Sequence, residues 1–180
     1  MQHLALISFI LLTAGLVFTA LKLPGGLGKT FSQRVANNKN AEILYSLLFV
    51  ATLPLLYLFF AIWFVPTKDV SQFFLLFAAT SVVFQILCTL VPERGGTMAI
   101  IHRVLTGISV IALLPMVFII STSHNITLGL RLFAWVALGL MFVLLAIALA
   151  NQKGFRYALL LQVGYYALFF AVVLMVTYIQ

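Results

Sequence analysis

The spacing of charged residues is the feature that most restricts the fold of this chain. Dividing the sequence at every Asp, Glu, Lys and Arg leaves six long uncharged runs: Met1–Leu21, Ile43–Thr67, Val70–Pro92, Val104–Leu130, Leu132–Gln152 and Tyr157–Gln180. Each run can contain the roughly 20 apolar residues that an α-helix needs to cross a bilayer. The runs are continuously apolar, without the alternation of a lipid-facing barrel strand. We therefore predict an all-α integral membrane protein, a bundle of six transmembrane helices.

The composition agrees with this class, and it helps to place the helices. Charged residues make up 7% of the 180 positions, far below the roughly 25% that is typical of soluble domains. The first run lacks the basic start of a signal peptide, because no Lys or Arg precedes it, so we keep it as a helix. Short connections after the first loop favour one domain, residues 1–180. The helices are expected at about 3–21, 42–65, 70–91, 98–121, 128–150 and 156–179.

The distribution of Lys and Arg predicts the orientation in the membrane. Eight of the ten lie in or beside the first, third and fifth loops: Lys22, Lys29, Arg34, Lys39, Arg94, Arg103, Lys153 and Arg156. The other two, Lys68 and Arg131, lie on the opposite side. The positive-inside rule makes the richer side cytoplasmic and puts both termini outside. We expect a multi-pass protein of the cell membrane, with membrane lipids rather than nucleic acid as its partners.

The ionisable residues exclude several functions. The three acids, Glu42, Asp69 and Glu93, all fall at predicted membrane boundaries, so no carboxylate is placed at mid-bilayer for ion-coupled transport. Two histidines belong to the outer side and one, His102, to the inner third, so haem held between two histidines does not fit. Two outer histidines alone make a poor metal site. We expect neither a metal nor a cofactor.

Two connections contain most of the polar sequence. The first loop, "LKLPGGLGKTFSQRVANNKNAE", is long and is expected to be irregular chain or a short interfacial helix. In "VPERGGTMAIIHR", Pro92 is expected to end the third helix and Gly95-Gly96 to form the turn. Thr97 is the expected N-cap of the fourth helix.

Polar side chains on several helices are predicted to meet in one cytoplasmic-side layer. His102 lies roughly 7 Å inside the fourth helix by its rise per residue. Its face continues through Thr106 and Ser109, and Ser81, Gln85 and Cys88 form a matching stripe on the third helix. The expected ligand-binding residues are His102, Gln85, Gln162, Tyr45, Thr106 and Ser109. The expected basic rim consists of Arg94, Arg103 and Arg156 with Glu93. Alternatively, these groups only hold the helices together, at about 0.6 kcal/mol per hydrogen bond.

Two segments also resemble a known family. "KTFSQRVANNKNAEILYSLLF" and "LVPERGGTMAIIHRVLTGIS" resemble domain-of-unknown-function family 998, small six-helix membrane proteins of prokaryotes. The resemblance implies the six-helix fold and family-like positions at Ser32, Pro92, Glu93 and His102, without an established activity. The family usually has an acid in the segment that reads Ser32-Gln33-Arg34 in this chain.

Three functions remain open at this stage. The first is a bundle that binds a lipid or another small amphipathic ligand in a polar pocket on the cytoplasmic side. The second is an accessory or assembly subunit of a larger membrane complex. The third is a lipid-modifying enzyme with His102 and Glu93 as an acid/base pair. The sequence favours a binding protein over an enzyme and does not identify the ligand, the oligomeric state or the organism.

Overall fold

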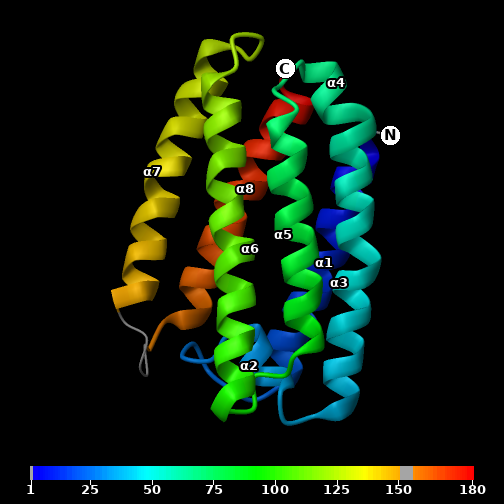
Figure 1. Ribbon diagram of the computed structural model, residues 1–180, viewed down its shortest axis with the longest axis vertical. Helices are drawn as coiled ribbons and strands as arrows, with labels where there is room; N and C mark the ends of the chain where they lie inside the picture. Colours follow the sequence, from blue (N-terminus) through cyan, green and yellow to red (C-terminus); the bar gives the residue numbers. More distant parts are fainter. Residues whose placement is uncertain (1, 151–155) are drawn as a thin grey trace.

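The computed structural model describes residues 2–150 and 156–180, and these form a bundle of long helices (Figure 1). The helices are α1 (His3–Lys22), α2 (Phe31–Val35), α3 (Lys39–Phe59), α4 (Val65–Lys68), α5 (Phe73–Leu90), α6 (Gly96–Thr122), α7 (Leu128–Ala150) and α8 (Ala158–Tyr178). A π-helical segment, Phe60–Phe64, joins α3 to α4 without a break. Within the described ranges, six helices are long and apolar enough to cross a membrane, as predicted. Lys153 lies outside the described residues.

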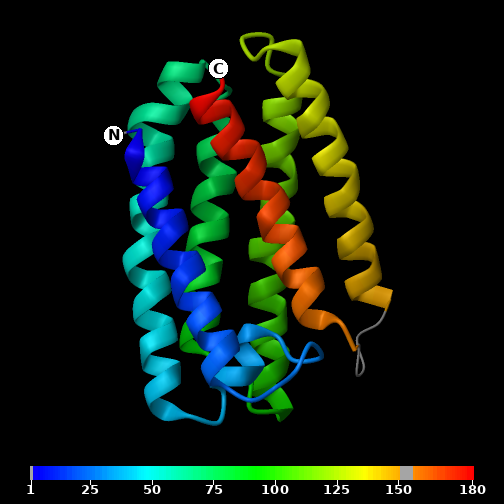
Figure 2. The ribbon, with the colours of Figure 1, turned by 180° about the vertical axis from the view of Figure 1, so that it is seen from behind.

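The six long helices follow one another around the bundle. Contacts join α1 to α3, α3 to α5, α5 to α6, α6 to α7, and α7 to α8, and α8 returns to α1 with fewer contacts. Figure 2 shows α1 and α8 side by side on the rear face. Both termini lie at the end of the bundle opposite α2. We call the end that carries α2 and the α5–α6 turn the basic end.

The turn between α5 and α6 confirms one expectation and corrects another. α5 ends at Leu90, just before Pro92. Gly95 and Gly96 have φ angles of +108° and +55°, a region that glycine enters without a steric cost. The predicted glycine turn is therefore present. Thr97 is not the N-cap, since α6 begins at Gly96 and Gly95 occupies the cap position.

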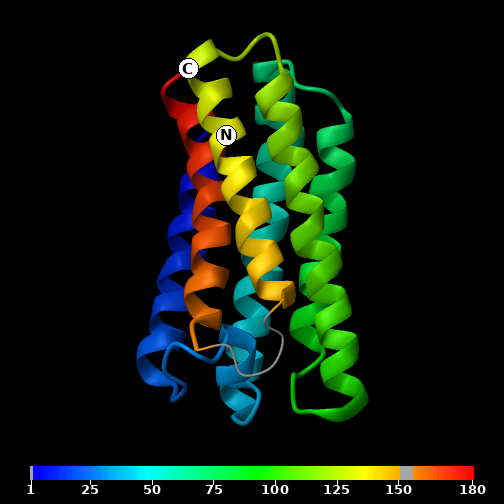
Figure 3. The same ribbon diagram turned by 90° about the vertical axis from the view of Figure 1, so that its left-hand side faces the viewer.

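The long first loop folds back onto the basic end as α2 (Figure 3). A capping box forms its start: the Thr30 hydroxyl accepts from the backbone N–H of Gln33, and the Gln33 side chain accepts from the N–H of Thr30. Four of its five residues are buried, Phe31, Ser32, Arg34 and Val35. The expectation of a short helix is met, but its burial shows that α2 packs into the bundle end.

Arg34 holds this loop in place. We expected it to be a loop cation, yet the residue is only 7% exposed. Its guanidinium donates to the carbonyl oxygens of Ala20, Leu23 and Lys29 at 3.0, 2.9 and 3.3 Å, and also to that of Gly26. Carbonyls at the end of α1 lack helical partners, so Arg34 satisfies them and complements the negative end of that helix.

Candidate functional site

The polar stripes of α5 and α6 face each other, as the sequence predicts. The Ser109 Oγ lies 3.1 Å from Gln85 Oε1 and 3.0 Å from the backbone oxygen of Ser81, so its one hydrogen is shared between these two acceptors. Three residues along each helix toward the basic end, Cys88 Sγ lies 2.9 Å from Thr106 Oγ1. These contacts hold α5 and α6 together through their polar side chains.

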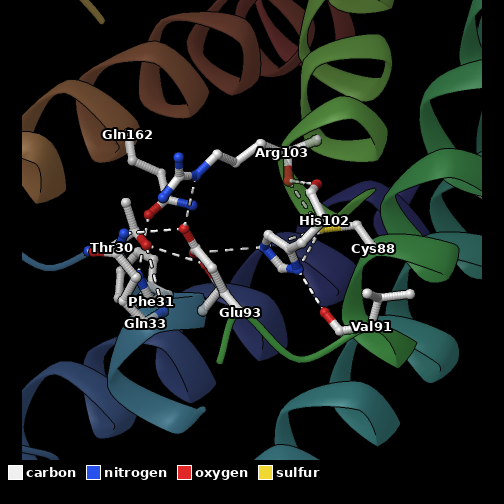
Figure 4. A network of polar contacts seen from close by, with 11 residues as sticks. Thr30, Phe31, Gln33, Cys88, Val91, Glu93, His102, Arg103 and Gln162 are labelled. Atoms are coloured by element: carbon white, nitrogen blue, oxygen red, sulfur yellow. Dashed lines mark hydrogen bonds and ion pairs between the residues drawn. The ribbon is translucent and has the colours of Figure 1, made fainter. Parts of the chain in front are cut away.

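His102 lies at the basic end of these contacts between α5 and α6. Its two ring nitrogens contact different groups (Figure 4). The residue is 4% exposed. Nδ1 lies 2.6 Å from the carbonyl oxygen of Val91, so Nδ1 carries a hydrogen and donates it. Nε2 lies 3.8 Å from Glu93 Oε2 and 3.3 Å from Cys88 Sγ. The bond to Val91 fixes the ring so that Nε2 is directed toward the carboxylate.

Glu93 joins α2 to the α5–α6 turn. Its side chain is 7% exposed and accepts hydrogen bonds from Ser32 Oγ at 2.9 Å and Gln33 Nε2 at 3.0 Å. The Nε of Arg103 lies 3.4 Å from Oε1, the carboxylate oxygen that also accepts from Gln33. Figure 4 shows the carboxylate between the α2 side chains and the His102 ring. A buried carboxylate is costly unless it is paired and hydrogen-bonded, and here both conditions hold.

Helix α8 adds an amide and two phenols to the site. Gln162 Oε1 accepts from the backbone N–H of Phe31 at 3.2 Å, which ties α8 to the start of α2. The Tyr166 hydroxyl donates to Gln85 Oε1 at 3.2 Å. The Tyr165 hydroxyl donates to the carbonyl oxygen of Val110 at 2.8 Å. Three helices and α2 therefore share one connected set of polar groups.

These residues line an open polar cavity of about 690 Å³ at the basic end. Five of the six expected ligand-binding residues line it: His102, Gln85, Gln162, Tyr45 and Thr106. Glu93 and Arg103 also line it. Sequence reasoning missed further polar lining residues, Thr30, Gln33, Tyr165 and Tyr166, and singled out Ser32, which also lines the cavity, only through the family resemblance.

A second, apolar cavity of about 280 Å³ adjoins the first. Both cavities are lined by Gln85, Gln162 and Tyr166, which therefore form the boundary between them. The sixth expected residue, Ser109, lines the apolar cavity. Most other lining residues are aliphatic or phenylalanine side chains from α1, α3, α5, α6 and α8.

The apolar cavity reaches the outer surface between α1 and α8. Its lining includes Thr13 and Val17 of α1 and Val163 and Ala167 of α8, all of which are exposed. These two helices share fewer contacts than the other adjacent pairs, and Figure 2 shows no helix covering the space outside them. An opening here would face the hydrocarbon of a surrounding bilayer.

The expected basic rim is only partly present. Arg103, with a side chain that is 62% exposed, lines the polar cavity. Arg94 does not line it, because its guanidinium binds the Glu42 carboxylate and the carbonyl oxygen of Ala36. Arg156 also lies elsewhere, with its guanidinium carbon 5.6 Å from the centre of the Tyr157 ring. Glu93 is not a rim residue but a buried centre of the network.

Some of the residues that were not predicted belong to a recognisable sequence pattern, and others do not. The Thr30-x-x-Gln33 spacing is a capping-box pattern and could have predicted the short helix α2. No local pattern could have placed Ser32 beside Glu93. Among residues 2–150 and 156–180, no group of three His, Cys, Asp or Glu side chains is arranged to hold a metal ion.

Comparisons with protein-family models, with curated proteins and with solved structures give no match to this chain. The function is therefore argued from the geometry of the two cavities.

Proposed function

We propose that this protein binds a small amphipathic molecule, such as a lipid, with its polar group in the polar cavity and its chain in the apolar cavity. The observation that carries the proposal is the shared boundary, Gln85, Gln162 and Tyr166, between a cavity rich in hydrogen-bonding groups and one lined mostly by apolar side chains. An amphiphile has the same order of chemistry along its length. A hydrophilic ligand would leave the apolar cavity unused.

The opening between α1 and α8 supports a ligand that comes from the bilayer. Apolar molecules partition into hydrocarbon, so a lateral opening gives them access without passage through water. In the orientation that the positive-inside rule favours, the polar cavity lies on the cytoplasmic side of the cell membrane. The likeness to domain-of-unknown-function family 998 is part of this proposal and adds a fold but no activity.

The test is to block the apolar cavity and measure retained lipid. Ala78 is 1% exposed and lines this cavity, so Ala78→Phe fills it. Its neighbour Ala79 is half-buried and does not line it, which makes Ala79→Phe the matched control. Native mass spectrometry of protein purified in mild detergent should show bound lipid in the native chain and the control, and at least a fivefold loss in Ala78→Phe.

A second blocking variant guards against misfolding. Val163→Trp changes a position at the opening that is 44% exposed, so it disturbs less packing than a substitution at the buried Ala78. If both blocking variants retain the bound lipid of the native chain, the apolar cavity is not the binding site and the proposal is wrong.

A lipid-modifying enzyme is the second candidate, and one observation favours it. His102 Nε2 and Ser32 Oγ both approach Glu93 Oε2, at 3.8 and 2.9 Å, on the wall of the polar cavity. A proton could move among these groups if a bound molecule reacted there. His102→Gln separates the candidates, because an enzyme would lose turnover of its bound lipid while a binding protein would keep its full function.

A further inference from the structure

The boundary between the two cavities is built mainly from two carboxamides whose oxygens are already engaged. Gln85 Oε1 accepts from the Tyr166 hydroxyl at 3.2 Å and lies 3.1 Å from the Ser109 hydroxyl. Gln162 Oε1 accepts from the backbone N–H of Phe31. Because a backbone N–H can only donate, this last bond fixes which end of the Gln162 amide is the oxygen.

The amide nitrogens are left for a ligand. Over the part of the chain that the structure describes, neither Gln85 Nε2 nor Gln162 Nε2 has a hydrogen-bond partner in the protein. Gln85 is 94% buried, since its exposed fraction is 6%. Because both side chains line the two cavities, these N–H groups are available to a bound molecule that supplies an acceptor.

The position of these donors specifies where on the ligand the acceptor must be. They lie where the polar cavity meets the apolar cavity, and therefore beside the atom at which the ligand's polar part meets its chain. In an acyl lipid, that atom is the carbonyl carbon of an ester or of a free carboxylate. Its oxygen is a strong acceptor, whereas an alkyl ether at the same place has no carbonyl oxygen.

From this geometry we infer that the ligand is an acyl amphiphile, whose acyl carbonyl oxygen accepts hydrogen bonds from the amide groups of Gln85 and Gln162. The inference rests on the proposed binding function and adds the chemical class of the ligand. The chain of such a molecule lies in the apolar cavity, and its head group lies in the polar cavity with Arg103 at the exposed edge.

Three probes with the same chain length test the inference: a palmitoyl lysophosphatidylcholine, its hexadecyl ether analogue, and palmitate. Their dissociation constants are measured by native mass spectrometry of the whole protein in detergent. One hydrogen bond contributes roughly fivefold in affinity, so the native chain should bind at least one acyl probe about fivefold more tightly than the ether. A preference for the lysolipid identifies an ester, and a preference for palmitate identifies a free carboxylate.

Variants at Gln85 connect the preference to the amide. Gln85→Glu keeps an acceptor oxygen for Tyr166 and Ser109 but loses the N–H donors, and Gln85→Met loses both. In each, the ratio of ether to acyl dissociation constants should fall clearly below the native value, because only the Gln162 donor remains, a change that general loosening of the site would not produce. The matched control is Gln72→Met at the exposed start of α5, which should keep the native ratio.

The outcomes distinguish failure of acyl recognition from failure of the proposed amphiphile binding. If acyl and ether probes bind equally and Ala78→Phe abolishes both, amphiphile binding stands and the recognition of a carbonyl is wrong. If no probe binds the native chain, both proposals are wrong. If the acyl preference is undiminished in both Gln85 variants, the acceptor is recognised elsewhere and the inference is overturned.

Discussion

Ser32 Oγ donates a hydrogen bond of 2.9 Å to Glu93 Oε2, although the two residues are 61 positions apart in the chain. Gln33 donates to the other carboxylate oxygen, so Glu93 holds two successive residues of α2. These bonds make the first loop the floor of the polar cavity, because Ser32 and Gln33 line it only while α2 is docked.

Removing the Ser32 hydroxyl should therefore destabilise the docked loop. Ser32→Ala should lower the free energy of unfolding by about 2 kcal/mol, because a buried bond to a charged acceptor is lost. SDS titration followed by circular dichroism measures this value. Thr97→Ala is the control: Thr97 is exposed and caps no helix, so a change within about 0.5 kcal/mol is expected. A Ser32→Ala effect no larger than the control's would contradict the docking role.

The Ser32–Glu93 bond also shows where sequence reasoning succeeds and where it stops. Helical periodicity was enough to bring His102, Thr106 and Ser109 against Gln85 and Cys88, because neighbours at i, i+4 and i+7 share a face whatever the tertiary structure. Uncharged run length was enough to place the spanning helices. Both signals are local, and both predictions are confirmed.

The role of Glu93 depends on a contact between distant segments. The positions of the charged residues place Glu93 at the membrane boundary beside arginines, and this predicts a solvated residue at the rim of the pocket. Its burial follows from the docking of α2, which in turn depends on Arg34 and the carbonyls at the end of α1. No spacing in the sequence encodes that geometry. The same holds for Arg94, whose distance from the cavity follows from its pairing with Glu42.

Arg34 gives the second prediction. Arg34→Met leaves four carbonyl oxygens without their donor, and Arg34→Lys replaces a planar fork with a compact ammonium that cannot reach all four. We expect Arg34→Met to lower the free energy of unfolding by about 3 kcal/mol and Arg34→Lys by somewhat less. Lys39→Gln removes an exposed cation at the start of α3 and should change the free energy of unfolding by less than about 0.5 kcal/mol.

Loss of Arg34 should also change the accessibility of Cys88. A loosened loop would expose the single cysteine, Cys88, which is 2% exposed and lines the polar cavity above α2. Maleimide labelling of the native protein should therefore be slow, and it should become at least tenfold faster in Arg34→Met. Equal labelling rates in the two proteins would show that α2 stays docked without Arg34.

His102 gives the third prediction. Glutamine can donate to the Val91 carbonyl and still offer a polar group to Glu93, so His102→Gln should stay folded and keep ligand binding. Leucine leaves the Val91 carbonyl without its donor and Glu93 against an apolar side chain, at a cost of about 1–3 kcal/mol. We expect His102→Leu to fold in detergent with a lower melting temperature and to lose bound lipid. If it unfolds completely, His102 is needed for the structure itself rather than for the ligand.

The last prediction concerns orientation, which decides from which leaflet the ligand comes. Because Cys88 is buried, an added surface cysteine is the main reactive thiol. Asn37 is exposed at the basic end and does not cap α3, a role that Asn38 fills, so Asn37→Cys leaves the helix start intact. Asn125→Cys places a thiol at the opposite end. With both termini outside, an impermeant maleimide applied to intact cells should label Asn125→Cys and spare Asn37→Cys, and both should react after the membrane is opened. The reverse pattern would place the polar cavity on the outer side, where an acyl ligand would have to come from the outer leaflet.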